Sequence, residues 1–127
     1  MSVTFVIGGA RSGKSTFAEL KAKEYSKKVL YIATAVVTDQ AMADRVKKHK
    51  EQRPLSWHTL EMYRDFKQLI EKPEFIGSEA ILIDCITTLI GNFMYDSKLD
   101  FDSCSAEDVN ILESIITDEV LCFPKYL

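Results

Sequence analysis

The sequence has few cysteines, and none of them pair at the spacing of a metal or redox site. Its three cysteines, Cys85, Cys104 and Cys122, are widely separated and odd in number. This pattern argues against a disulfide framework and against a Cys-x-x-Cys zinc or redox motif, and it indicates reduced thiols. The sequence also lacks an apolar run near the ~20 residues that a membrane helix needs. Because its first residues form no basic and apolar leader, we expect a cytoplasmic protein without a membrane span.

Internal repeats, linkers and low-complexity segments are also absent, so residues 1–127 are expected to form one domain. The net charge is −3, and the basic residues are not interleaved with stacking aromatics, which argues against nucleic-acid binding. The charge is uneven. Residues 1–60 contain eleven Lys or Arg against five Asp or Glu, whereas residues 61–127 contain five against fourteen. The basic half therefore suits a polyanionic ligand.

That basic half contains a complete match to the phosphate-binding pattern G-x-x-x-x-G-K-[ST], formed by Gly8, Gly9, Ala10, Arg11, Ser12, Gly13, Lys14 and Ser15. In such a loop the glycines allow backbone N–H groups to point at phosphate oxygens, the lysine contacts the β- and γ-phosphates, and the hydroxyl can bind Mg²⁺. The dinucleotide pattern G-x-G-x-x-G is absent, because Ala10 stands at its second glycine. The motif predicts binding of a nucleoside triphosphate.

The flanks of this loop predict a strand and a helix. Residues 3–7 are β-branched and aromatic with little polar alternation, which is typical of a parallel strand buried on both faces. Residues 15–25 contain no Pro or Gly and favour a helix, whose N-terminus would face the phosphates. Together these elements predict an α/β P-loop fold, with a mostly parallel sheet and helices on both faces.

Two further strands are predicted at residues 29–33 and 80–84. Ligands of open α/β sheets bind beyond the carboxyl ends of the strands, so Ala33, Thr34 and Ala35 are expected beside the phosphate loop. Asp84 ends the last of these strands. A carboxylate at a strand tip can bind a water of the Mg²⁺ opposite Ser15, so Ser15 and Asp84 are the candidate metal residues.

A helix is predicted over residues 39–52, with Met42, Val46, His49 and Arg53 along one stripe. A lone helical histidine is more often structural or surface-exposed than catalytic, so periodicity leaves both roles open for His49. His58 lies in an alternating segment typical of an edge strand, and no role is assigned to it.

Three more helices are expected. The first covers residues 63–72, buries Phe66, Leu69 and Ile70, and ends at Pro73. The second covers residues 87–95. The third is capped by Ser105, has Val109, Leu112, Ile116 and Val120 on one face, and ends at Pro124.

Five segments in order resemble the bifunctional adenosylcobinamide kinase and adenosylcobinamide-phosphate guanylyltransferase family of cobalamin synthesis: residues 8–15, 31–35, 45–54, 57–61 and 82–87. The resemblance implies two reactions. An NTP phosphorylates adenosylcobinamide, and GMP then passes from GTP, through a guanylylated histidine, to the phosphorylated corrinoid to give adenosylcobinamide-GDP. It implies that His49 is this histidine. It also implies that the GTP is surrounded by Ala33, Thr34, Ala35, Lys50, Glu51, Gln52, Arg53, Glu61 and Asp84. It also implies a homo-oligomer.

The resemblance ends near the last residues. Members of the family continue beyond this point with further strands, so the sheet is expected to lack C-terminal strands and to expose apolar faces. Two other functions stay open: a nucleotide-binding remnant that completes neither transfer, and a generic small-molecule P-loop kinase with an incidental His49. The sequence does not decide between ATP and GTP as the kinase donor.

Overall fold

The computed structural model describes the backbone of residues 2–126 and the side chains of residues 2–122. Its centre is a three-stranded parallel sheet in the order β2-β1-β3. β1 (Val29–Ala33) lies between β2 (His58–Glu61) and β3 (Ala80–Asp84). The predicted strands at residues 29–33 and 80–84 are confirmed, and the segment around His58 is an edge strand as its alternation indicated.

The residues of β1 alternate between the two faces of the sheet, as the pleat of a strand requires. Leu30 and Ile32 are fully buried in a core with Phe66, Leu69 and Leu89, to which Phe93 and Leu112 also belong. On the opposite face, Val29 and Tyr31 pack with Trp57. Both faces of β1 are therefore covered, which explains its nearly unbroken apolar sequence.

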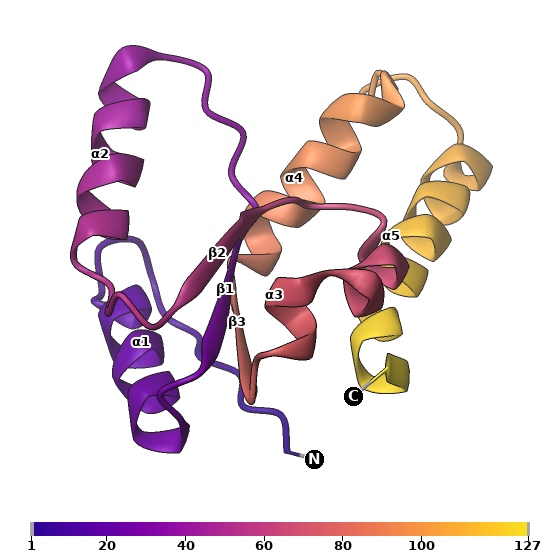
Figure 1. Cartoon of the computed structure of the whole chain (residues 1–127). Helices are drawn as coiled ribbons and strands as arrows, with labels where there is room; N and C mark the ends of the chain where they lie inside the picture. Colours follow the sequence, from indigo (N-terminus) through magenta and orange to yellow (C-terminus); the bar gives the residue numbers. More distant parts are fainter. Residues whose placement is uncertain (1, 127) are drawn as a thin grey trace.

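Helices lie on both sides of the sheet (Figure 1). One side carries α1 (Lys14–Tyr25) and α2 (Gln40–Glu51), and the other carries the 3₁₀ helix η1 (Phe66–Glu71), α3 (Pro73–Ile76), α4 (Ile86–Ser97) and α5 (Ala106–Tyr126). The predicted P-loop-type α/β architecture is confirmed. No helix among residues 2–126 is long and apolar enough to cross a membrane.

The predicted cap of the last helix is confirmed, but its predicted end is wrong. Ser105 Oγ accepts a hydrogen bond from the Asp108 N–H at 3.1 Å, and Asp108 accepts one in return from the Ser105 N–H at 3.3 Å. The helix then continues past Pro124 to Tyr126. Proline disfavours a helix interior by removing one donor and crowding the preceding turn, but this cost is finite and does not forbid a further turn.

The strand predicted at residues 3–7 is wrong: these residues pair with no strand in the described chain. Val3, Phe5 and Ile7 are 61%, 78% and 89% exposed. The apolar composition of the segment is suited to a strand covered on both faces. A strand, however, also needs a neighbour and covering layers, and residues 2–126 place neither against this segment.

The helix predicted over residues 63–72 is also wrong. The chain forms the shorter η1, and Pro73 is the first residue of α3 rather than a stop signal. A proline at this position costs little because its missing N–H would have no partner within the helix. Phe66 and Leu69 are buried as predicted, but Ile70 is 38% exposed, because the tighter 3₁₀ turn presents a different face.

The surface of the chain is large for its mass. The accessible area is 9057 Å², whereas a compact monomer of 14.4 kDa is expected to expose about 6,800 Å². Part of the difference comes from apolar side chains such as Phe5, Ile7 and Phe17. These residues are uncovered within the described chain.

The packing of the larger core predicts the cost of a cavity. Leu89 is fully buried between β1 and the helices of its face. Leu89→Ala is expected to lower the free energy of unfolding by about 2–5 kcal/mol, measured by urea denaturation. The same substitution at the fully exposed Leu55 provides the control. Equal losses for the two variants would contradict this description of the core.

Candidate functional site

The phosphate-binding motif forms a loop that leads directly into α1. Gly13 precedes the helix with φ 82°, and Arg11 is also left-handed at φ 55°. A side chain at Gly13 would strain this turn, so the motif glycine is explained by backbone geometry. The Lys14 ammonium donates a hydrogen bond to the Gly9 carbonyl at 3.2 Å, which holds its charge against the loop.

The N-terminus of α1 is suited to an anion. No side chain among residues 2–122 caps this helix, and its first intrahelical bond runs from the Phe17 N–H to the Gly13 carbonyl at 3.0 Å. The preceding N–H groups therefore have no intrahelical partner, and they carry the positive end of the helix dipole. A phosphate is the kind of group that binds at such a position.

The parallel register aligns three candidate residues at the carboxyl edge of the sheet. Ala33 of β1 is paired with Glu61 of β2 on one side and with Asp84 of β3 on the other. The strand tips that the sequence singled out thus lie in one row. The edge continues into a hollow of about 560 Å³ lined by residues 35–37 and 61–64.

Thr34, which follows β1, is fully buried, and its polar atoms form hydrogen bonds within the fold. Its hydroxyl donates to the Cys85 carbonyl at 2.7 Å and accepts from the Cys85 N–H at 2.9 Å. The Asn92 amide donates to the Thr34 carbonyl at 2.7 Å. These bonds join the tip of β1 to the start of α4. Sequence reasoning missed Asn92, because no local pattern links it to a residue 58 positions away.

Asp84 is held by a tyrosine that sequence reasoning also missed. The Tyr31 hydroxyl donates to Asp84 Oδ2 at 2.5 Å. Burial of the ring, and then this hydrogen bond, raise the pKa of Tyr31 well above its usual range. Tyr31 therefore remains a neutral donor that orients the carboxylate. Its inward position follows from strand alternation, but its partner on β3 depends on the register between strands.

Arg53 covers the ring of Tyr31 from the α2 side. Its guanidinium carbon lies 3.4 Å from the ring centroid, and its Nη1 donates to Thr59 Oγ1 at 3.3 Å. The Arg53 side chain is only 6% exposed. A cation that lies over an aromatic face in a desolvated site is stabilised by the ring quadrupole. The predicted nucleotide residue Arg53 thus lies beside the tyrosine that holds Asp84.

His49 lies one turn before Arg53 and faces α1. Its Nδ1 is 4.0 Å from Oε1 of Glu19, and the same oxygen is 4.0 Å from Arg53 Nε. Both polar residues of the predicted stripe, His49 on α2 and Arg53 just after it, approach the same carboxylate. This part of the stripe prediction is confirmed. Glu19 was not singled out in the sequence, because a glutamate inside a helix carries no local signal.

The remaining predicted residues of α2 do not join this cluster. Lys50, Glu51 and Gln52 are exposed at the end of the helix, and among residues 2–122 their side chains have no hydrogen-bond or ion-pair partner. Glu61 is likewise exposed at the tip of β2. Within the described part of the chain, the side chains of these four residues therefore form no hydrogen bond or ion pair with His49, Arg53 or Glu19.

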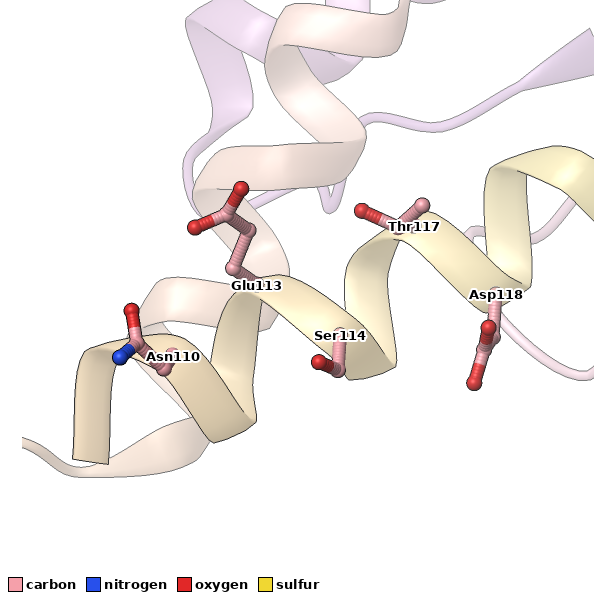
Figure 2. Close-up of a pocket in the computed structure, with 5 residues that line it drawn as sticks. All are labelled: Asn110, Glu113, Ser114, Thr117 and Asp118. Atoms are coloured by element: carbon pink, nitrogen blue, oxygen red, sulfur yellow. The ribbon is translucent and has the colours of Figure 1, made fainter. Parts of the chain in front are cut away.

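A second hollow, of about 370 Å³, lies elsewhere. Figure 2 shows its five lining residues, Asn110, Glu113, Ser114, Thr117 and Asp118, all on α5. Helix α5 lies on the opposite side of the sheet from α1 and α2 (Figure 1). A concavity along one helix, without a second element to close it, gives no reason to place nucleotide chemistry there.

Comparisons with known proteins show the family of this chain. Residues 4–122 match the family model for cobinamide kinase / cobinamide phosphate guanyltransferase. The chain belongs to this family. The match begins before the phosphate loop and extends through most of α5, so it includes every candidate site residue.

Among curated relatives, the bifunctional adenosylcobalamin biosynthesis protein CobU of Escherichia coli K12 is 37% identical over 115 residues, and that of Salmonella typhimurium LT2 is 39% identical over 115. Each match covers 91% of this chain and 62% of the relative. The bifunctional adenosylcobalamin biosynthesis protein CobP of Pseudomonas aeruginosa PAO1 is 38% identical over 89 residues, which are 70% of this chain and 51% of the relative. The chain thus spans less than two thirds of these relatives' lengths.

The predicted Mg²⁺ residues of this family member have suitable donor chemistry. Ser15 and Asp84 offer oxygen ligands, and α1, which carries Ser15, packs against β3, which ends in Asp84. One oxygen of Asp84 accepts from Tyr31, so its other oxygen is available to an ion or its water. No group of three or more His, Cys, Asp or Glu in the described residues could hold a metal alone. This set fits a Mg²⁺ that arrives with nucleotide phosphates and keeps several waters.

The raised pKa of Tyr31 predicts a loss of stability at alkaline pH. Because the folded state favours the neutral phenol, this contribution is present below the usual tyrosine pKa of 10.0 and is lost as pH rises above it. Tyr31→Phe is therefore expected to show a smaller fall in melting temperature between pH 9 and 11. Tyr25→Phe, at an exposed tyrosine, should behave like the parent chain. Identical pH profiles for all three chains would contradict the prediction.

Proposed function

We propose that this chain phosphorylates adenosylcobinamide with an NTP and transfers GMP from GTP, through guanylylated His49, to adenosylcobinamide phosphate. The observation that carries the proposal is a continuous series of contacts. It runs from His49 and Glu19 to Arg53, then to Tyr31 and Asp84. It thus links the histidine helix, and α1 directly after the phosphate loop, to the carboxyl edge of the sheet. The family membership supports the same assignment.

In the proposed guanylyl transfer, the lone pair of an imidazole nitrogen of His49 attacks the α-phosphorus of GTP. A nitrogen–phosphorus bond forms, the bond to the β-phosphate oxygen breaks, and pyrophosphate leaves with the electron pair. The Lys14 ammonium and the loop N–H groups stabilise the charge of the leaving group. Mg²⁺ supplies further charge neutralisation when it is bound with the nucleotide. An oxygen of the corrinoid phosphate then displaces His49.

In the proposed kinase step, the same loop holds the β- and γ-phosphates while the acceptor hydroxyl attacks the γ-phosphorus. The bond between the γ-phosphorus and the bridging oxygen breaks, the nucleoside diphosphate leaves with the electron pair, and the hydroxyl proton passes to water. The donor is ATP or GTP. The hollow beside Ala35 and Glu61 is the position in which we expect the acceptor, because it borders the carboxyl edge of the sheet. Cytoplasmic location stays a prediction from the sequence, and a homo-oligomeric state stays a prediction of the family resemblance.

Covalent labelling tests the guanylyl half-reaction. The folded chain is incubated with Mg²⁺ and GTP labelled at the α-phosphate, and the protein is then denatured. We expect the label to remain on the protein and to be released by acid but not by alkali, as a phosphoramidate should be. His49→Ala should abolish the labelling, whereas His58→Ala, at the chain's second histidine, should leave it unchanged.

The other outcomes identify the alternatives. A folded chain whose melting temperature rises with GTP but which takes no label would be a binding remnant. A chain that phosphorylates other small alcohols but not adenosylcobinamide, with or without His49, would be a generic kinase. Label that persists in His49→Ala would contradict the role of this histidine.

A further inference from the structure

One carboxylate oxygen of Glu19, Oε1, is buried between the side chains of His49 and Arg53. The Glu19 side chain is 15% exposed, whereas Lys21 and Lys23 on the same helix are exposed. Oε1 lies 4.0 Å from both His49 Nδ1 and Arg53 Nε, which is beyond hydrogen-bond distance for either. Among the described residues, Oε1 and Arg53 Nε are buried polar atoms without a hydrogen-bond partner.

An unpaired buried carboxylate oxygen is costly, so its position requires an explanation. Arg53 is held over the Tyr31 ring and bonds Thr59 through Nη1, and in this arrangement its Nε stays 4.0 Å from Oε1. The His49 side chain is 50% exposed and less constrained. A small rotation of the imidazole would bring its Nδ1–H into hydrogen-bond distance of Oε1 and satisfy the carboxylate.

We propose that Glu19 is a positioning residue for His49: its carboxylate accepts the Nδ1–H and leaves the Nε2 lone pair as the nucleophile of guanylyl transfer. This inference rests on the proposed function of His49. The two ring nitrogens point in different directions, so engaging one of them at α1 leaves the other available to a nucleotide. The bond made by one ring nitrogen sets which tautomer is present.

The negative charge of the Glu19 carboxylate also stabilises the positive charge that forms on the His49 ring during the reaction. When Nε2 bonds to the α-phosphorus and pyrophosphate leaves with the electron pair, the ring retains its Nδ1 proton and becomes cationic. The negative charge of Glu19 then lies beside that cation in a site partly shielded from water, where the attraction is stronger than at the surface. When the acceptor phosphate displaces the ring, the neutral Nδ1–H tautomer is restored. No additional base is required.

The histidine tautomer can be measured without any nucleotide. In a His58→Ala background only His49 remains, so its ¹⁵N and ¹H correlations are assigned directly. We expect the nucleotide-free chain to show the Nδ1–H tautomer of the neutral ring. Glu19→Gln should lower the population of this tautomer, because the uncharged amide is a weaker acceptor and can also donate to an unprotonated Nδ1. Glu24→Gln, on the same helix with an exposed carboxylate, should behave like the parent chain. Equal tautomer populations in the parent and Glu19→Gln would overturn the proposal.

The labelling rate gives a second, independent readout. Carboxylates that hold a metal-binding histidine typically contribute about 10–100-fold, and we expect an effect of this size for a carboxylate that holds a nucleophilic histidine. Glu19→Gln should slow labelling by that factor with little change in KM for GTP, and the parent should carry its label on Nε2. An unchanged rate, or label on Nδ1, would overturn the proposal. If the parent takes no label, the proposed function fails, and the tautomer comparison alone decides the role of Glu19.

Should Glu19→Gln not fold, Glu19→Asp replaces it. This variant keeps a negative charge near Arg53 but withdraws the carboxylate by one methylene. The same loss of the Nδ1–H tautomer is expected. A tautomer population equal to that of the parent would again contradict the positioning role.

Discussion

The burial of β1 on both faces is the constraint on which the other elements depend. Val29 and Tyr31 face one side, and Leu30 and Ile32 the other, so each side requires a covering layer. The two parallel neighbours also fix the register that aligns Ala33, Glu61 and Asp84. The candidate site is thus a consequence of the packing of one short strand, because its side chains lie where that strand ends.

Sequence patterns were sufficient to predict those elements whose start, end or burial depends on residues within the same segment. Unbroken apolar runs located β1 and β3, the stop before Pro54 bounded α2, and Ser105 marked the start of α5. The turn before α1 was also predictable, because its left-handed backbone favours glycine at Gly13. In each case the deciding interactions occur between residues close in the chain.

The failures share a physical reason. Residues 3–7 have strand composition, but pairing requires a partner that local composition does not specify. At residues 63–72 the apolar spacing suited an α-helix. The chain instead forms the 3₁₀ helix η1, which packs against α5. Tyr31, Asn92 and Glu19 acquire their roles from partners on other elements. No periodicity within one segment contains that information.

Helices α2 and α4, on opposite sides of the sheet, differ in how firmly they are attached to the core. Helix α4 contributes the buried Leu89 and Phe93 and is bonded to the tip of β1 through Asn92, whereas α2 has no buried residue of its own. Local opening of α2 therefore exposes little apolar surface and costs much less free energy than opening the sheet. Backbone amides of α2 should exchange with deuterium well before those of β1. The histidine is thus carried on a part of the molecule that can rearrange without unfolding the core.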